Sequence, residues 1–540
     1  MKVVTTEEMR RIEREADAGG LSYATMMENA GRAVAEACQR MGVTDKRILV
    51  LVGPGNNGGD GLVAARHLHD AGAQVNIYIW KRKIEGDENF GLAQERDIPT
   101  VWAEEDTDLA ALQRLLDETD FILDALLGTG LSRPIKGLLK EILEVTRRGI
   151  RERFVVAVDV PTGLNCDTGA VDPVTLPADL TVTFAFPKLG FFLFPGAEYV
   201  GELIVADIGI PDALAEDVQI ELTTPGMVRA ILPERPLGAH KGTFGKALLV
   251  AGSVNYTGAA YLASAAATRV GTGLVTLALA RSLHPILASK LTEVTFLLLP
   301  ESLGVIVPEA VKLLNERIAE YDALLLGPGL GREEETVEFV HRLLGLESKL
   351  TKPRIGFLPS EEAVTESSLP PMVIDADGLN ALSEAPEWWK HLKGEVVLTP
   401  HPGEMSRLMG CSIAEIEGDR IGVVRRMAQE WGQVVLLKGA YTLIATPEGR
   451  VFINPFANPG LATAGTGDVL AGAIVGLLAQ GLSPRDAAIA GAYLHGLAGQ
   501  MARDEVGEMG MVAGDLLPFL PKGIRELRDR CNVLWLMSRP

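Results

Sequence analysis

The chain has 540 residues, of which 47% are hydrophobic and 23% charged, an ordinary globular composition in a chain too long for a single core. Its 71 acidic side chains outnumber its 51 basic ones and give a formal net charge of −20. Such an acidic surface disfavours nucleic acid and anionic membranes as main partners, but it allows phosphorylated small molecules, which need only local positive charge.

Cysteine usage and the distribution of apolar residues favour a cytoplasmic protein. The four cysteines lie far apart and form no CxxC pair, so neither a disulfide framework nor a zinc site is indicated. The amino terminus has no apolar signal core, and no run reaches the roughly 18 apolar residues of a membrane helix. We therefore expect the protein in the reducing cytoplasm.

A glycine-rich loop follows the first predicted strand. The apolar run Arg47–Gly53 is typical of a strand buried in a parallel sheet. It leads into GPGNNGGDG, which ends at Gly61, and we predict a helix from Leu62 to Ala71. Strand, glycine loop and helix form the layout of a nucleotide-binding turn, although the spacing is neither GxGxxG nor a P-loop. The asparagine and aspartate oxygens suit a sugar, a phosphate or a hard cation. A turn that serves only close packing is the alternative.

Two further predicted strands, Phe121–Leu127 and Phe154–Pro161, also lead into glycine loops. In an open α/β sheet, ligands bind beyond the carboxyl ends of the strands. We therefore expect Asp60, Asp124 and Asp159 to converge on one crevice.

The three loops GNNGGDG, DALLGTGLSRP and DVPTGLNCDTG resemble those of the NAD(P)H-hydrate epimerase domain, over most of residues 1–210. The resemblance implies a potassium ion bound by Asn57, Asp124 and Thr162. It also implies contacts between the hydrated dinucleotide and Asn56, Asn57, Gly58, Gly59, Asp60, Gly128, Thr129, Gly130, Leu131, Ser132, Arg133, Pro134 and Asp159. We take Asp159 as the catalytic acid/base, because a carboxyl in a partly dry site can both give and accept a proton. Asp60 stays the alternative.

An aromatic stretch and a proline-rich join follow. Phe184–Phe194, with Lys188 in its middle, is predicted to be a strand region that serves the core or a dimer contact rather than a stacking platform. Four prolines lie between Pro211 and Pro236, so we place the domain boundary near residue 215. The two predicted domains are therefore residues 1–215 and 216–540.

Strand-like runs recur in the second part, and helical stretches separate the earlier ones, which predicts an α/β fold with a mainly parallel sheet. These runs are Leu274–Ala278, Ala323–Leu326, Met372–Ile374, Glu395–Leu398, Val434–Lys438 and Leu443–Thr446. Several end in polar loops. His401 lies between two prolines and is expected to contact a ligand. Lys438 and Gly439 can offer a cation and a bare amide to a phosphate.

The sequence AGTGD, residues 464–468, precedes a small and apolar stretch, Val469–Val475, that is typical of a buried helix. Free N–H groups at a helix start form an anion site together with the helix dipole, and glycine lets a phosphate approach closely. An acid such as Asp468 at the mouth of this site suits proton removal from an attacking hydroxyl. A simple helix cap is the alternative.

AGTGD, with Lys438–Thr442 upstream, resembles the ribokinase-like ADP/ATP-dependent NAD(P)H-hydrate dehydratases over roughly residues 225–520. The resemblance implies that the hydrated dinucleotide contacts Ala259, Gly329, His401 and Asp468. It implies nucleotide binding by Lys438, Gly439, Ala440, Tyr441, Thr442 and Gly467, with Mg²⁺ and ADP or ATP as the donor. Asp468 would take the proton of the hydrate hydroxyl, whose attack on the terminal phosphoryl group creates a better leaving group.

Together these patterns predict a Rossmann-like three-layer α/β domain followed by a ribokinase-like α/β domain, as in bifunctional NAD(P)H-hydrate repair enzymes. The expected partners are hydrated NADH or NADPH and ADP or ATP, and the family resemblance implies a homo-oligomer. Two alternatives stay open. One is a ribokinase-like kinase of a vitamin precursor, such as a hydroxymethylpyrimidine or a thiazole alcohol. The other makes the amino-terminal domain a non-catalytic sensing or assembly module. The sequence of residues 523–540 indicates no function.

Overall fold

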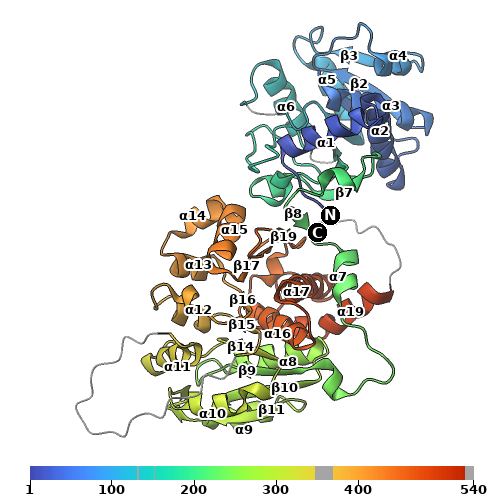
Figure 1. Cartoon of the computed structure of the whole chain (residues 1–540). Coiled ribbons are helices and arrows are strands. Elements are labelled where there is room, and N and C mark those ends of the chain that lie inside the picture. Colours follow the sequence, from blue (N-terminus) through green and yellow to red (C-terminus); the bar gives the residue numbers. More distant parts are fainter. Residues whose placement is uncertain (131–132, 151–152, 347–368, 530–540) are drawn as a thin grey trace, which may run out of the picture. The chain divides into compact units, whose positions relative to one another are not determined.

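The computed structural model describes residues 1–130, 133–150, 153–346 and 369–529. Within them the chain divides into two compact units, one that spans Met1–Ile220 and one that begins at Glu221 (Figure 1). Leu131 and Ser132, predicted to contact the substrate, lie outside the described residues, as do residues 530–540 of the tail. None of the described helices is both long and apolar enough to cross a bilayer.

The first unit is built on seven parallel strands in the order β3-β2-β1-β4-β5-β6-β7. Its strands are β1 (Arg47–Val52), β2 (Gln74–Ile79), β3 (Thr100–Trp102), β4 (Phe121–Ala125), β5 (Phe154–Val158), β6 (Leu180–Phe184) and β7 (Glu202–Ala206). Its helices are α1 (Thr6–Ala18), α2 (Tyr23–Arg40), α3 (Asn56–Asp70), α4 (Glu88–Gln94), α5 (Ala110–Glu118) and α6 (Leu138–Gly149). The strand order reverses between β1 and β4, which is where such sheets open a ligand crevice.

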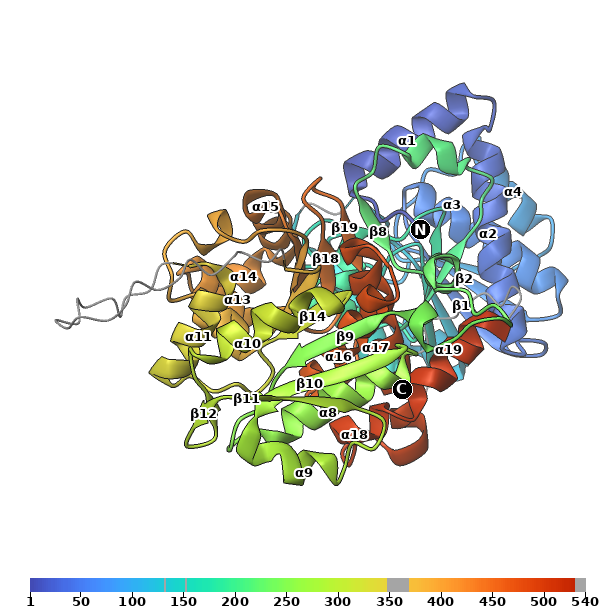
Figure 2. The same ribbon diagram turned by 60° about the horizontal axis from the view of Figure 1, so that its bottom comes forward.

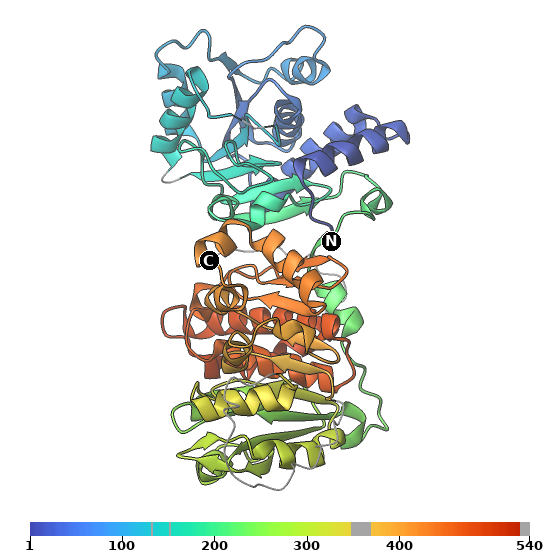
Figure 3. The same ribbon diagram turned by 60° about the vertical axis from the view of Figure 1, so that its left-hand side comes forward.

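Two apolar cores cover the faces of this sheet. One joins the strands to α1, α2, α3 and α4, and the other joins them to α5 and α6 (Figure 3). Both faces of the central strands are buried, which explains why the sequences of β1 and β4 are almost continuously apolar. The predicted three-layer α/β architecture is confirmed.

The second unit contains a ten-stranded sheet in the order β11-β10-β9-β14-β15-β16-β17-β18-β19-β8. The strands from β11 to β17 are parallel, and β17, β18 and β19 are antiparallel. Its strands are β8 (Ile220–Leu222), β9 (Lys246–Val250), β10 (Leu274–Ala280), β11 (Thr295–Leu299), β14 (Ala323–Leu326), β15 (Met372–Ile374), β16 (Val396–Leu398), β17 (Val434–Leu437), β18 (Leu443–Ala445) and β19 (Val451–Ile453). A small separate pair is formed by β12 (Glu301–Ser302) and β13 (Val305–Ile306).

Helices surround this second sheet, and the prediction of a mainly parallel α/β domain is confirmed. They are α7 (Pro225–Ile231), α8 (Thr257–Arg269), α9 (His284–Ala288), α10 (Ala310–Arg317), α11 (Glu334–Leu344), α12 (Asp377–Leu382), α13 (Pro402–Met409), α14 (Ile413–Gly418), α15 (Arg420–Trp431), α16 (Thr466–Ala479), α17 (Pro484–Val506), α18 (Ala513–Leu516) and α19 (Phe519–Asp529). Helices α8 and α16 lie side by side, with α8 against β9 and β10 and α16 against β14 (Figure 2).

Helix α3 starts earlier than predicted. It begins at Asn56 rather than Leu62, so the asparagines and glycines of the loop form its first turns. The glycines allow this because the helix start lies tightly against the sheet. A Cβ on Gly58 would lie 2.1 Å from the carbonyl oxygen of Gly53, and one on Gly61 would lie 2.4 Å from Cβ of Ala125. Close packing therefore accounts for part of the glycine pattern.

The aromatic stretch is not the continuous strand region predicted from sequence. Strand β6 ends at Phe184, and a 3₁₀ turn occupies Leu189–Phe192. Ala185 has a φ of 56°, which leaves the extended conformation, and Pro187 has no N–H group for a sheet ladder.

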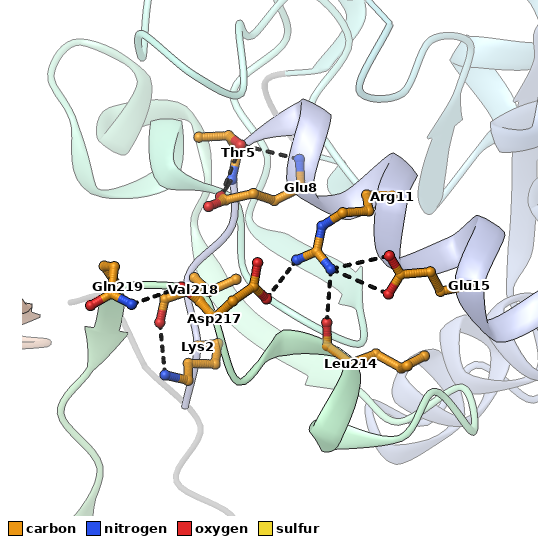
Figure 4. A network of polar contacts seen from close by, with 9 residues as sticks. All are labelled: Lys2, Thr5, Glu8, Arg11, Glu15, Leu214, Asp217, Val218 and Gln219. Atoms are coloured by element: carbon orange, nitrogen blue, oxygen red, sulfur yellow. Dashed lines mark hydrogen bonds and ion pairs between the residues drawn. The ribbon is translucent and has the colours of Figure 1, made fainter.

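A network of polar contacts ties the first residues of the chain to the end of the first unit (Figure 4). Lys2 donates from Nζ to the carbonyl oxygen of Val218 over 2.7 Å. Arg11 of α1 donates to Asp217 over 2.7 Å and to the carbonyl oxygen of Leu214 over 3.4 Å. These contacts hold both the segment before α1 and the middle of α1 against residues 214–218.

The close approach of α8 and α16 leaves no room for a side chain at Gly472, where a Cβ would lie 2.2 Å from the carbonyl oxygen of Ala263. Because backbone cannot rotate away, we expect Gly472→Ala to lower the free energy of unfolding of the second unit by about 2 kcal/mol. Gly226→Ala in α7 is the matched control, since its Cβ would meet nothing within 4 Å. The control should be neutral or stabilising by up to about 1 kcal/mol. Thermal unfolding of both variants tests this, and equal stabilities would contradict it.

Candidate active sites

The three residues predicted to bind potassium lie at the carboxyl edge of the first unit's sheet, where Asp124 and Thr162 contact each other and Asn57 lies by the loop after β4. Asp124, at the end of β4, is 1% exposed and accepts hydrogen bonds from Thr162 Oγ1 at 2.7 Å and Thr162 N at 2.8 Å. Burial raises the pKa of Asp124, and the hydrogen bonds from Thr162 and from the Leu126 amide oppose that rise. Asn57 lies beside the loop that follows β4, since a Cβ on Gly128 would lie 3.3 Å from Cβ of Asn57.

The Asn57 side chain is the most informative group in this crevice. It is buried, and neither its oxygen nor its nitrogen has a hydrogen-bond partner among the described residues. Buried polar groups are nearly always partnered in folded proteins. An unpartnered amide at a sheet's carboxyl edge therefore indicates a place for a ligand or an ion.

Asp159 follows β5 and is held in a left-handed conformation, with a φ of 61°. Its Oδ1 atom accepts from Lys188 Nζ at 2.5 Å and from Thr183 Oγ1 at 2.9 Å. Lys188 is 1% exposed. The sequence analysis placed Lys188 in a core or dimer region and missed this partnership. The available signal was the lysine itself, because a charged residue in a buried aromatic stretch requires a counter-charge.

Asp60 is buried in the first turns of α3. Its carboxyl group has no hydrogen-bond partner among the described residues. Burial raises its pKa well above the usual value. The charges of Asp159 and Glu13 raise it further, and those of Lys188 and Arg82 lower it. The protonated form of Asp60 is therefore favoured beside Asp159.

The other predicted contacts of this site lie on the same edge of the sheet. Asn56, Gly58 and Gly59 form the first turn of α3. The remaining ones belong to the loop after β4, where Gly128 and Thr129 are half-buried and Gly130, Arg133 and Pro134 are exposed.

In the second unit, Asp468 lies in the first turn of α16. This helix begins directly after Gly465, whose φ is 92°. Burial raises the pKa of Asp468 to about 7, Asp375 adds to the rise, and Lys438 opposes it. The carboxyl therefore lies close to its titration point at neutral pH, which suits a group that must take up a proton.

Lys438 carries the positive charge of this site. Its Nζ atom lies 2.8 Å from Asp375 Oδ1 and 3.4 Å from Glu404 Oε2. Burial lowers the pKa of Lys438, but the two carboxylates outweigh burial and raise it. A Cβ on Gly467 would lie 3.5 Å from the same Nζ atom, so the ammonium group lies at the start of α16. Asp375 and Glu404, which follow β15 and β16, were not among the predicted site residues.

His401 has a structural role in addition to the predicted ligand contact. It caps α13, and its Nδ1 atom accepts from the amides of Gly403 at 2.9 Å and Glu404 at 3.4 Å. Burial lowers the pKa of His401 and favours the neutral ring that this cap requires. The ring is half-exposed, and its Nε2 atom lies 3.5 Å from Glu404 Oε1.

Ala259 and Gly329 lie next to each other. Gly329 has a φ of 63°, and a Cβ there would lie 2.8 Å from Cβ of Ala259 and 2.7 Å from Cβ of Tyr256. Ala259 belongs to α8, and α8 also reaches the start of α16, because a Cβ on Gly465 would lie 2.6 Å from Leu262.

The segment from Lys438 to Thr442 forms a tight turn after β17. Gly439 has a φ of 144° and Tyr441 a φ of 51°, while Ala440 lies between them. Thr442 Oγ1 donates to the carbonyl oxygen of Gly439 over 2.8 Å. The turn thus presents backbone next to the Lys438 ammonium group.

These features describe a two-unit α/β protein with a carboxyl in the first turn of a helix near a lysine in one unit, and with buried polar side chains at the carboxyl edge of the sheet in the other. The model of the NAD(P)H-hydrate dehydratase family matches residues 247–522, and that of the YjeF-related protein N-terminus matches residues 23–190. The bifunctional NAD(P)H-hydrate repair enzyme of Moorella thermoacetica is 42% identical over 545 aligned positions, which cover 99% of this chain and 98% of the relative. The chain belongs to the family of bifunctional NAD(P)H-hydrate repair enzymes.

Two further similarities were found. The bifunctional NAD(P)H-hydrate repair enzyme of Escherichia coli is 33% identical, with 97% of this chain and 94% of the relative covered. A solved structure of the ADP/ATP-dependent NAD(P)H-hydrate dehydratase of Bacillus subtilis, crystallised with ATP and Mg²⁺, is 32% identical. It covers 57% of this chain and 98% of that protein, with a TM-score of 0.46.

The raised pKa of Asp468 makes stability depend on pH. Its value of about 7, against an ordinary 3.8, means that the folded chain binds this proton more tightly than the unfolded chain. The resulting stability is present below about pH 4 and is lost as the pH rises through about 7. A shift of about three units corresponds to about 4 kcal/mol, which we halve to about 2 kcal/mol because the group is partly open to solvent.

Asp468→Asn removes this dependence. As the pH rises from 4 to 8, the free energy of unfolding of the second unit should therefore fall by about 2 kcal/mol more in the parent than in the variant. Urea unfolding of both proteins across this range measures the gap, because other titrating groups cancel in the comparison. A gap that does not change with pH would contradict the assignment.

Proposed function

We propose that this chain repairs hydrated nicotinamide dinucleotides with two activities. Residues 1–215 epimerise the R and S forms of hydrated NAD(P)H, and residues 216–540 dehydrate the S form with ADP or ATP. The full-length similarity to bifunctional repair enzymes supports this assignment. The observation that carries it is the position of Asp468, a partly buried carboxyl with a pKa of about 7 beside the Lys438 ammonium group at a helix start.

The dehydratase chemistry follows from these groups. Hydroxide is a poor leaving group from the hydrated ring. Asp468 in its ionised form accepts the proton of that hydroxyl, which then attacks the terminal phosphoryl group of the nucleotide. The free N–H groups at the start of α16 and the Lys438 ammonium group stabilise the charge on the transferring phosphoryl oxygens. Phosphate then leaves with the electrons of its carbon–oxygen bond, the neighbouring ring carbon loses a proton to solvent, and the double bond of the dihydronicotinamide is restored.

Magnesium fits this site as a companion of the nucleotide. The described residues contain no group of three or more His, Cys, Asp or Glu side chains arranged to hold a metal ion by themselves. Mg²⁺ is commonly held by one or two carboxylates together with substrate phosphates. Asp375 and Glu404, which lie around Lys438, would supply those carboxylates, and the ion would neutralise phosphate charge.

The epimerase chemistry acts on the same hydroxyl group. Addition of water to the dihydronicotinamide ring places the hydroxyl on a carbon bonded to the ring nitrogen, where its configuration can be reversed by proton transfer. Asp159 lies in the crevice at the end of β5, and Asp60 is a second carboxyl near it. We assign Asp159 as the group that takes and returns the proton, since its side chain is fixed by hydrogen bonds.

Potassium fits the crevice because the Asn57 side chain is buried without a partner. The Asn57 oxygen, the Asp124 carboxylate and the Thr162 hydroxyl would hold the ion, which would supply positive charge to anchor an oxygen of the substrate. The hard oxygen donors of this set suit an alkali cation better than a transition metal.

A cytoplasmic location and a homo-oligomeric state complete the proposal. The described cysteines Cys38, Cys166 and Cys411 are free, which agrees with a reducing compartment. The oligomeric state rests on the family resemblance. No observation favours the vitamin-kinase alternative, which gives no use for the first unit.

The central test supplies purified protein with both epimers of hydrated NADH, Mg²⁺, and ADP or ATP, and follows recovery of dihydronicotinamide absorbance. We expect full recovery with the parent. Asp468→Asn should slow recovery at least about 100-fold, because a general base is lost, while R and S still interconvert. Asp486→Asn, the same change in the first turn of α17, is the control and should behave as the parent.

The outcomes separate the two halves of the proposal. Recovery of only half of the material would remove the epimerase assignment. Retained recovery in Asp468→Asn would remove the role of Asp468. No recovery with the parent would favour the vitamin-kinase alternative.

Potassium dependence provides an independent test of the first unit. We expect replacement of K⁺ by choline at constant ionic strength to slow R-to-S conversion at least about tenfold, because the buried oxygens of the crevice lose their counter-charge. Chromatography of the two epimers without nucleotide measures epimerisation alone. Asn57→Ala should be slow in both salts. Equal rates of the parent in K⁺ and choline would contradict a potassium site.

A further inference from the structure

The Lys188 ammonium group is held by three acceptors in the interior of the first unit. It donates to Asp159 Oδ1 at 2.5 Å, to Thr183 Oγ1 at 2.8 Å and to the carbonyl oxygen of Phe184 at 3.3 Å. An ammonium group has three N–H donors, so all of them are used. The result is a cation in one fixed position, 1% exposed, with its charge directed at a single carboxylate oxygen.

The backbone around Lys188 is fixed by the first residues of the chain. Val4 pairs with Lys188 in a parallel bridge. Its amide donates to Pro187 O over 3.0 Å, and its carbonyl accepts from the amide of Leu189 over 3.0 Å. Polar contacts of Lys2 and Arg11 hold the same segment in place (Figure 4). The cation is therefore positioned by elements that are distant in sequence.

Only one of the two carboxylate oxygens of Asp159 accepts hydrogen bonds from the described residues. Its Oδ1 atom receives Lys188, Thr183 and the amide of Phe184, the last at 3.4 Å. Its Oδ2 atom has no hydrogen bond to any residue that the structure describes. A carboxylate with one saturated oxygen and one open oxygen has a defined direction for accepting a proton.

We propose that Lys188 is a positioning residue for epimerisation, which holds Asp159 as a carboxylate and leaves Oδ2 as the atom that takes the substrate's hydroxyl proton. This inference rests on the proposed epimerase function and deepens it.

The proton transfer balances without any further reagent. Oδ2 takes the hydroxyl proton, the bond between that carbon and the ring nitrogen breaks, and the carbon–oxygen bond becomes a carbonyl. The electron pair of the broken bond goes to the ring nitrogen, where it is conjugated with the carboxamide. After rotation of the carbonyl group, the nitrogen attacks its other face, and Oδ2 returns the proton to the new hydroxyl oxygen.

Other ionisable groups around this pair come from several elements. They are Arg10 and Glu13 of α1, Asp60 of α3, Arg82 after β2, and Cys166 and Asp167 after β5. Burial raises the pKa of Glu13 and of Asp60, and each is raised further by the charge of Asp159. These two carboxyls are thus disposed to stay neutral, and Asp159 is the carboxyl that Lys188 contacts directly.

The test is Lys188→Met in the full chain, which keeps the length of the side chain and removes its charge. We expect kcat for R-to-S conversion to fall at least about 100-fold at pH 7, with KM within about threefold. Loss of the ammonium makes the carboxylate harder to form, so the acid limb of the pH–rate profile should move up by about one pH unit or more. Dehydration of the S epimer by the same preparation should keep the parent rate, which reports that the second unit is intact.

Two control variants separate charge from structure. Thr183→Val removes a hydrogen bond to the same Oδ1 atom without removing the cation, and its acid limb should stay in place. Lys188→Arg keeps the charge and should convert R to S at least about tenfold faster than Lys188→Met. The unfolding transition of Lys188→Met shows whether its first unit folds. If it does not fold, the acid limbs of the pH–rate profiles of Lys188→Arg and Thr183→Val decide whether the charge of Lys188 matters.

A double variant tests whether Lys188 acts through Asp159. Asp159→Asn should reduce epimerisation by at least about 100-fold, and the addition of Lys188→Met should reduce it no further. An additive loss, an unmoved acid limb in Lys188→Met, or parent-like kcat would overturn the inference. If instead the parent itself fails to interconvert the epimers, the proposed function fails and not the role of Lys188.

Discussion

In both units a buried lysine is held against carboxylates at the carboxyl edge of a parallel sheet. Lys188 lies 2.5 Å from Asp159, and Lys438 lies 2.8 Å from Asp375. Removing charges from water is costly, and a buried pair tolerates the cost only when geometry and extra hydrogen bonds are good. Loss of one partner leaves an uncompensated charge. Within the first unit the segments that follow β5 and β6 are therefore tied together by electrostatics as well as by their sheet, and within the second unit the same holds for the loops that follow β15 and β17.

The architecture was accessible from sequence, since apolar runs such as Ala323–Leu326 form strands whose neighbours on both faces are also apolar. The positions of the polar loops followed, because parallel strands end at one edge. Partnerships between distant residues were not accessible. Asp375 and Lys438 are 63 residues apart, and nothing in either loop identifies the other. The early start of α3 was not predicted because glycine disfavours helices locally. The close packing of Gly58 against Gly53 and of Gly61 against Ala125 explains why glycines stand there.

In the proposed mechanism, the two sites apply different chemistry to one hydroxyl group. In the second unit, a carboxyl near its titration point, a lysine and a helix start are arranged to move a phosphoryl group onto the oxygen. In the first, a carboxylate with one open oxygen is arranged to borrow a proton and return it. The described residues assigned to each site all belong to that site's own unit. Each half can therefore be lost by a local change while the other half keeps working.

The bridge between Val4 and Lys188 makes the extreme amino terminus part of an interior structure. Recombinant versions that begin after Val4 would lack the segment that braces a buried cation. We expect such a preparation to lose conversion of R to S while its second unit still converts the S epimer. It would then be recorded as a single-activity dehydratase, so a biochemical survey of this protein needs its first four residues in place.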